Sequence, residues 1–281
     1  MSTMLPNWTH NDIEIHGHSI HYYRTGRGQE GKPSLVLLHG FSDNGLCWLP
    51  VARDLQEEWD VILPDAHGHG LSARLQPGER LDMVADAAGL IQALKLDRPV
   101  VGGHSMGANI AAQVDARYSG LARALILEDP PWFKPQVAPS AGEQEPRRPS
   151  LNALAEWLMS ISVKTVEEVM EKGRADNPGW PEIEMLPWAE SKLQFDTAFL
   201  HTEGDWPGWT DVARSIHCPA LLITADPEKG AIVTPQTASQ AAGLSRSIQV
   251  IQIPEAGHNI RRENYTAYMQ AVKGFLGTLQ A

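Results

Sequence analysis

Ser105 lies in the stretch GHSMG and is the residue of this chain best placed to act as a nucleophile. Gly103 and Gly107 flank it at two residues' distance, the apolar pair 100–101 precedes it, and small residues at 108–112 follow. Gly-x-Ser-x-Gly between a buried strand and a helix predicts a tight corner. There the serine takes a strained backbone conformation, and the glycines leave room where a Cβ atom would collide. We therefore expect Ser105 to present its Oγ for attack, with an ordinary glycine-rich turn as the alternative.

A serine hydroxyl is a weak nucleophile until a base removes its proton. Histidine suits this task because its unperturbed pKa is about 6.5. Of the eleven histidines, His258 follows the last predicted strand in a glycine-containing loop. This location puts it at the carboxyl edge of the strands, together with Ser105, where open α/β sheets bind their ligands. We expect His258 to be the base, with a loop histidine of no function as the alternative.

A carboxylate must hold the imidazole of His258 in the correct tautomer. Three acidic residues follow predicted strands at the same edge. Asp226 comes directly after the strand expected at 220–224 and is the preferred candidate. Asp129, after the strand expected at 124–128, and Glu228 remain alternatives. The common structural explanation for Asp129 is a turn residue ahead of two prolines.

The elements that must position these residues alternate between short apolar runs and helical patterns. Segments 13–15 and 19–23 predict a hairpin around Gly17. Buried strands are expected at 34–38, 60–64, 98–103, 124–128, 220–224 and 247–253. Helices are expected at 48–57, 81–94, 108–118 and 264–279. This alternation predicts an α/β fold with a doubly wound, mostly parallel sheet.

One long interval, 131–213, contains no buried-strand run and breaks the alternation. Helical patterns at 151–161 and 164–175 indicate a helical insertion into a core domain formed by residues 1–130 and 214–281. Six of the nine tryptophans lie in the insertion: Trp132, Trp157, Trp180, Trp188, Trp206 and Trp209. Some of them must build the insertion's own core. The others are expected to line an apolar pocket that faces Ser105.

Four segments occur in the order that is typical of the α/β-hydrolase fold family: LLHGF (37–41), PDAHGHGLS (64–72), GHSMG (103–107) and EAGHNIRRE (255–263). The chain resembles this family over nearly its whole length. It differs at His67, where arginine is usual, and at 224–235, where the usual Gly-x-x-Asp and Val-Pro are replaced by TADPEKGAIVTP. The resemblance implies a Ser–acid–His triad and a cap formed by the insertion. It also implies an oxyanion hole made by the backbone N–H groups of Phe41 and Met106.

Composition excludes several other classes. The formal charge is −11, from 34 acidic and 23 basic residues, which argues against nucleic acid or an anionic membrane as partner. No signal peptide or membrane-spanning run is visible, so a cytoplasmic protein is expected. Cys47 and Cys218 are expected to be free thiols. The His67–His69 pair lacks further ligands at a suitable spacing, so no metal is expected, and the chemistry needs no cofactor.

These residues together predict a serine hydrolase that cleaves a small or medium, largely apolar carboxylic ester or lactone. The expected partner is therefore that small-molecule substrate, and the sequence does not specify an oligomeric state. Amide cleavage, carbon–carbon bond hydrolysis and perhydrolysis use the same triad and remain alternatives. A ligand receptor that keeps the fold with little or no turnover is the alternative from another class.

Overall fold

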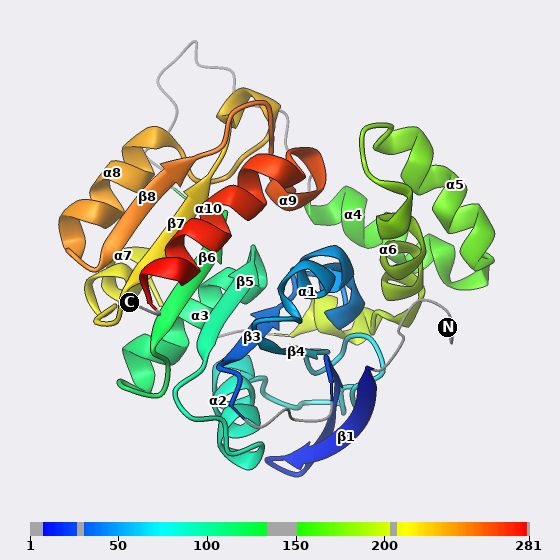
Figure 1. Cartoon of the computed structure of the whole chain (residues 1–281). Coiled ribbons are helices and arrows are strands. Elements are labelled where there is room, and N and C mark those ends of the chain that lie inside the picture. The colour runs from blue at the N-terminus through cyan, green and yellow to red at the C-terminus, as the bar shows by residue number, and fades with distance from the viewer. Residues whose placement is uncertain (1–7, 27–30, 134–150, 203–206, 280–281) are drawn as a thin grey trace.

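Eight strands form one mixed sheet in the order β1-β2-β4-β3-β5-β6-β7-β8 (Figure 1). The structure is a computed structural model and describes residues 8–26, 31–133, 151–202 and 207–279. The strands are β1 (Thr9–Ile15), β2 (His18–Arg24), β3 (Ser34–Leu38), β4 (Asp60–Pro64), β5 (Val100–His104), β6 (Ala124–Glu128), β7 (Ala220–Thr224) and β8 (Ile248–Gln252).

The hairpin β1–β2 pairs antiparallel with β4, and all pairings from β4 to β8 are parallel. At the carboxyl end of the central strands, Leu38 is opposite Gly103, and His104 is opposite Glu128. The loops after β3, β5, β6, β7 and β8 therefore leave the sheet at one edge. All of the residues proposed for chemistry lie in these loops.

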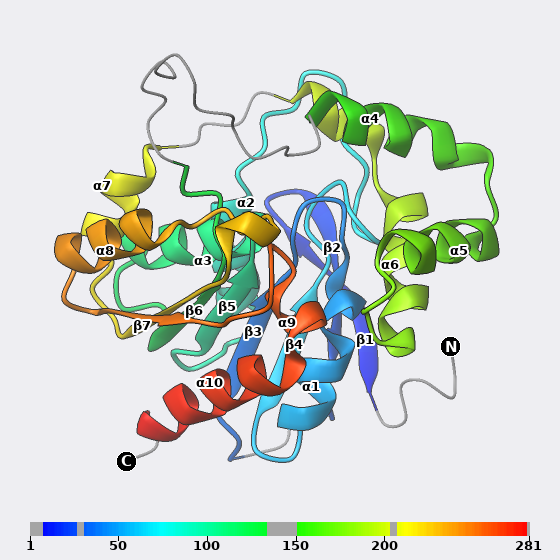
Figure 2. The same ribbon diagram turned by 90° about the horizontal axis from the view of Figure 1, so that it is seen from above.

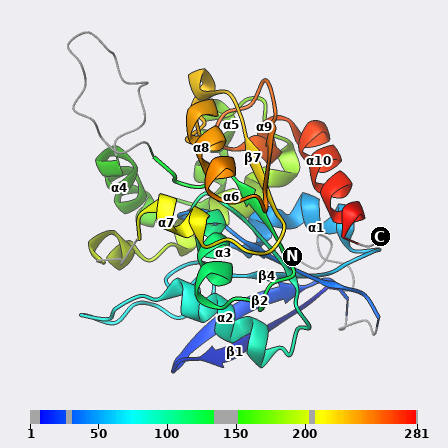
Figure 3. The same cartoon turned by 90° about the vertical axis from the view of Figure 1, so that its left-hand side faces the viewer.

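Helices cover both faces of the sheet (Figures 2 and 3). Residues of α2 (Met83–Ala93), α3 (Met106–Arg117), α7 (Trp209–Arg214) and α8 (Pro235–Leu244) pack on one face. Residues of α1 (Leu49–Leu55), α9 (Ile260–Glu263) and α10 (Tyr265–Thr278) pack on the other. Side chains define several helix starts: Asp82 and Thr234 cap α2 and α8 by accepting hydrogen bonds from backbone N–H groups.

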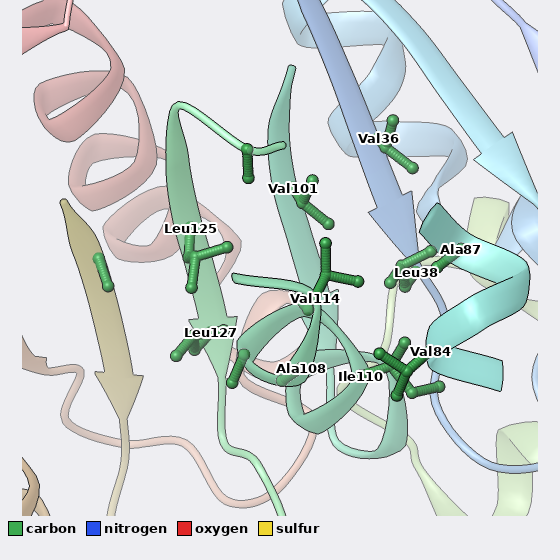
Figure 4. Packing of buried hydrophobic residues seen from close by; sticks show 14 of the residues in the cluster. Val36, Leu38, Val84, Ala87, Val101, Ala108, Ile110, Val114, Leu125 and Leu127 are labelled. Carbon is green, nitrogen blue, oxygen red and sulfur yellow. The ribbon is translucent and has the colours of Figure 1, made fainter. Parts of the chain in front are cut away.

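The helix that follows Ser105 lies in the centre of the first face. Figure 4 shows Val114 of α3 next to Val101 of β5, Ala108 on the side of Leu127 of β6, and Ile110 next to Val84 of α2. Burial of such apolar side chains stabilises the fold by about 25 cal/mol per Å² removed from water. Small residues along α3 let this helix approach the sheet closely, which fixes the position of its first turn.

Between β6 and β7 the described chain is helical and contains no strand. It forms α4 (Leu151–Ser160), η2 (Ile161–Val163), α5 (Val166–Asp176), α6 (Glu182–Gln194), η3 (Thr197–His201) and α7. The elements from α4 to η3 share a small apolar cluster that includes Leu158, Val169 and Phe195. The helical character agrees with the sequence, while the division into a core domain and a cap stays a prediction.

The sequence identified most elements but missed some. The hairpin, the strands and the free state of both cysteines are confirmed. Helices α6 and α8 were not predicted, and α6 contains Pro187, which hides its helical pattern. The expectation that 247–253 is a strand buried on both faces is wrong, because β8 is an edge strand in which only Ile248 is buried. No helix in the described ranges is long and apolar enough to cross a membrane.

Candidate active site

Ser105 occupies the turn between β5 and α3 in a conformation that disfavours most side chains. Its φ is 51° and its ψ is −115°. A Cβ atom on Gly103 would lie 2.3 Å from the carbonyl carbon of Gly107, and one on Gly107 would lie 2.2 Å from the carbonyl oxygen of Leu38. Only glycine fits at either position, so the backbone forms the tight corner that the sequence predicts and leaves Ser105 partly exposed.

Two backbone N–H groups next to this corner are free to stabilise negative charge. Phe41 follows β3, Met106 begins α3, and within the described residues neither N–H donates a hydrogen bond. His39 fixes the loop before Phe41, because its Nδ1–H donates to the carbonyl of Gly40 and its Nε2 accepts from the N–H of Ala66. Burial lowers the pKa of His39, which keeps the imidazole in the neutral form that both contacts require.

The side chain of His258 forms a short hydrogen bond with the carboxylate of Asp129. The distance from Nδ1 to Oδ2 is 2.6 Å. Asp129 is fully buried, and its oxygens also accept from the N–H groups of Ile232 and Val233, both at 2.8 Å. Three donors therefore fix the orientation of this carboxylate. Among the described residues no hydrogen bond joins His258 to Ser105, a contact that often tightens only when substrate binds.

Asp226 does not contact His258, so the prediction that it orients the imidazole is wrong. Its carboxylate accepts from the N–H of Glu255 at 2.8 Å and from Nε2 of Gln252 at 3.1 Å. Asp226 therefore supports, from its outer side, the loop between β8 and His258. Glu228 is exposed in η4 (Pro227–Lys229), and among the described residues no hydrogen bond joins it to His258.

The reason for this difference lies in the segment after β7. The residues that separate Asp226 from α8 form η4 and then bring the N–H groups of Ile232 and Val233 to Asp129. Asp129 itself has a φ of 40°, which turns its side chain out of the strand direction and toward His258. Such a strained backbone is maintained only where the surrounding contacts fix it. The sequence showed the unusual segment but not where its backbone would donate.

His104, which precedes Ser105 in the chain, supports His258 directly. Its Nε2–H donates to the carbonyl of His258 at 2.9 Å, and the two rings lie 4.7 Å apart. Burial, with Arg261 and His258 nearby, holds the pKa of His104 well below its ordinary value. A Cβ atom on Gly40 would lie 2.7 Å from Nδ1 of His104. His104 therefore fills the space between the loop that carries Phe41, called here the oxyanion loop, and the loop that carries His258, called the histidine loop.

A buried network of charges connects the loops of the site. Lys192 of α6 donates to the carbonyl of Ser42 at 2.9 Å and to Oδ1 of Asp43 at 2.6 Å. Arg262 bridges Asp43 and Glu184 at distances of 3.1 and 3.0 Å. Burial alone would raise the pKa of Asp43, but Arg262, Lys192 and Arg261 together hold it well below its ordinary value.

The network also reaches the strand that carries Asp129. Arg261, three residues after His258, pairs with Glu128 at 3.2 Å, and both side chains are completely buried. The guanidinium of Arg261 also lies 4.2 Å above the ring of Trp48. This network was not predictable from the sequence, because its members are far apart in the chain.

The tryptophans expected to line the pocket serve mainly in packing. Trp157 stacks on Trp188, and Trp180 meets Trp188 edge-on, within the cluster of the helical insertion. Trp132 is fully buried, stacks on Trp209 and donates to Oδ1 of Asn109, which lies on α3. Trp206 lies outside the described residues. Whether any tryptophan contacts a substrate therefore stays a prediction.

A cluster of three phenylalanine rings and one histidine ring lies at the oxyanion loop. The ring of Phe41 contacts Phe195 and Phe199, with centroids 5.0 and 5.8 Å apart. The ring of His69 packs edge-on against both, at 5.0 and 4.9 Å. Burial, with His39 nearby, holds the pKa of His69 well below its ordinary value, so this cluster carries no charge at neutral pH.

Comparison with known proteins agrees with this fold. Residues 35–271 match the model of the alpha/beta hydrolase family. The chain is 28% identical to an N-formylmaleamate deformylase of Pseudomonas putida, over 94% of this chain and 95% of that protein. It is 25% identical to a 2-(acetamidomethylene)succinate hydrolase of Mesorhizobium japonicum, over 87% and 88%. A carboxylesterase structure from Bacillus subtilis superposes with a TM-score of 0.71 at 20% identity, over 98% of this chain and 93% of that one.

The roles of the two aspartates can be separated by isosteric substitution. Asp129→Asn should lower kcat by about 10⁴-fold, because the amide can no longer hold the required tautomer of His258. Asp226→Asn, the matched control, should change kcat less than about tenfold, since it touches only the outside of the loop. Steady-state kinetics with an activated ester, alongside circular dichroism of both variants, measures this difference. A large loss in Asp226→Asn with normal turnover in Asp129→Asn would contradict the assignment.

Removal of one cation from the buried network should cost both stability and turnover. We expect Lys192→Met to lower the free energy of unfolding by about 3 kcal/mol, because Asp43 then loses one of its buried partners. Lys172→Met removes an exposed pair with Asp176 on α5 and should cost less than about 0.5 kcal/mol. Urea unfolding and kcat of both variants are the measurements. Equal stability of the two variants would show that the network does not hold the loops.

Proposed function

Because the chain belongs to the alpha/beta hydrolase family, we propose that it is a serine hydrolase that cleaves a small or medium, largely apolar carboxylic ester or lactone. The observation that carries this proposal is the short hydrogen bond between His258 and the buried carboxylate of Asp129, near a serine with a strained backbone. A nucleophile, a base and a group that orients the base are the parts that acyl transfer requires.

In the proposed reaction, Oγ of Ser105 attacks the carbonyl carbon while Nε2 of His258 accepts the hydroxyl proton. The N–H groups of Phe41 and Met106 donate to the oxyanion, and each such donor contributes about 3 kcal/mol of transition-state binding. His258 then gives the proton to the leaving alcohol, and the acyl group stays on Ser105. A water molecule attacks the acyl-enzyme as His258 takes its proton, which releases the acid and restores the serine.

The aromatic cluster around Phe41 supports a substrate that carries an apolar group next to its reacting carbonyl. A substrate whose oxyanion binds the N–H of Phe41 lies close to the ring of the same residue, and behind it are Phe195, Phe199 and His69. An uncharged aromatic wall binds alkyl or aryl groups and disfavours a carboxylate, because a buried charge needs a partner. This favours neutral esters or lactones.

Amide cleavage is the second candidate function. It is favoured by the two relatives that align over most of the chain, whose names describe an acetamido compound and an N-formyl compound. The same residues could act on an amide, with His258 protonating a leaving nitrogen instead of an oxygen. The carboxylate-bearing compounds in those names fit the uncharged cluster beside Phe41 less well.

A matched substrate panel tests both candidates. We expect turnover of p-nitrophenyl butyrate at a kcat/KM at least about tenfold above that of a carboxylate-terminated ester of equal length, since one unfavourable pocket contact is worth about 1–3 kcal/mol. N-formyl and N-acetyl amides and a series of lactones complete the panel. A fluorophosphonate should label Ser105, as shown by the mass of the labelled peptide.

Ser105→Ala should lose at least about 10³-fold of the activity, while Ser162→Ala, which removes an exposed serine of η2, should retain it. Faster turnover of amides than of matched esters would favour the second candidate. Labelling of Ser105 without turnover of any substrate would favour a ligand receptor. Normal activity in Ser105→Ala would contradict the proposed nucleophile.

A further inference from the structure

Three side chains with metal-ligating atoms meet away from Ser105, where the start of β2 approaches the loop before α2. His18 is the first residue of β2, and His67 and Glu79 lie in the loop between β4 and α2. One ligand atom of each lies within 4.8 Å of the others. Asp86 of α2 pairs with His18, because its Oδ1 is 3.1 Å from Nε2 of the imidazole.

His67 lacks a hydrogen bond that burial normally demands. Its side chain is only 2% exposed, and in the described part of the chain its Nε2 has no hydrogen-bond partner. This nitrogen is 3.8 Å from Oε2 of Glu79, which is beyond hydrogen-bond distance. A buried nitrogen that faces a carboxylate without reaching it indicates a ligand that binds both.

A hollow lies next to the cluster. Its walls include His67 and Asp86 together with apolar side chains of β2, β3 and α2. Glu79 on the outer side is less buried, with 27% of its side chain exposed, so its carboxylate can move by rotation of the side chain. The N–H of Gln76 is its hydrogen-bond donor, at 2.8 Å.

We propose that His18, His67 and Glu79 form a binding site for one divalent transition metal ion of the Zn²⁺ type, with Asp86 holding the imidazole of His18 in place. Imidazole nitrogens and carboxylate oxygens are the ligands that this ion accepts, and tetrahedral ligand atoms lie roughly 3.3 Å apart. The rings of His18 and His67 are stacked with centroids 4.0 Å apart, so coordination turns the rings and closes the cluster by about an ångström.

The site contains His67 of the His67–His69 pair, but not His69. His69 points the other way, donating from Nδ1 to the carbonyl of His67 and packing against Phe195. Of the other ligands, His18 comes from the N-terminal hairpin and Glu79 from the far end of the same loop. A bound ion would therefore join the hairpin to both ends of the loop between β4 and α2, and would stabilise the fold without taking part in the reaction at Ser105.

Zinc titration of the metal-free protein tests the proposal. The full chain is stripped with a chelator, desalted and titrated with ZnCl₂ by calorimetry, and metal content is measured after gel filtration. We expect one ion per chain and a melting temperature that rises with zinc concentration. His67→Ala and Glu79→Gln should each weaken the affinity at least tenfold. His217→Ala, which removes an exposed histidine ahead of β7, should bind zinc like the wild type.

Glu79→Gln keeps the test valid if His67→Ala is unstable, because Glu79 lies at the surface and its amide preserves the shape. Circular dichroism of the metal-free variants verifies their folding. Zinc binding of unchanged affinity in both variants would assign the ion to another place and overturn the proposal. Absence of stoichiometric binding by the wild type would overturn it as well.

Discussion

Asp43 is buried among Lys192, Arg261 and Arg262, and these three cations come from elements that border the catalytic residues. Lys192 belongs to α6 of the helical insertion, and the arginines begin the helix after His258. Because Asp43 is two residues from Phe41, one carboxylate connects the oxyanion loop, the histidine loop and the insertion. A buried charge without partners is very costly, so these loops cannot separate independently. The proposed active site depends on this constraint.

Two residues of the proposed triad have a strained backbone next to this network. Ser105 and Asp129 both have positive φ values, which few non-glycine residues adopt. The glycines around Ser105 permit its conformation, and backbone donors from 232–233 maintain that of Asp129. Arg261 pairs with Glu128, the residue before Asp129, and so joins the strained acid to the same network. A rigid surrounding of this kind keeps donors and acceptors oriented before substrate arrives, which is how such sites lower reaction barriers.

The sequence predicted what depends on local rules. Short apolar runs identified the strands. The glycines beside Ser105 identified the corner, because a Cβ atom at either position would collide with nearby backbone. On the sequence alone Asp226 was preferred to Asp129. The choice depends on which backbone N–H groups donate to each carboxylate, and those that donate to Asp129 lie about 100 residues later in the chain. Lys192 gave no signal, since its partner Asp43 lies 149 residues earlier and α6 contains a proline. The edge position of β8 was missed because strand order is a property of the whole sheet.

The central claim is that the imidazole of His258 donates to Asp129, and the proton between them can be observed directly. NMR of the protein labelled with ¹⁵N-histidine should show a far-downfield proton bound to Nδ1 of one histidine, as expected for a hydrogen bond of 2.6 Å between these groups. This resonance should persist in Asp226→Asn and disappear in Asp129→Asn. A resonance that persists in Asp129→Asn and disappears in Asp226→Asn would contradict the account.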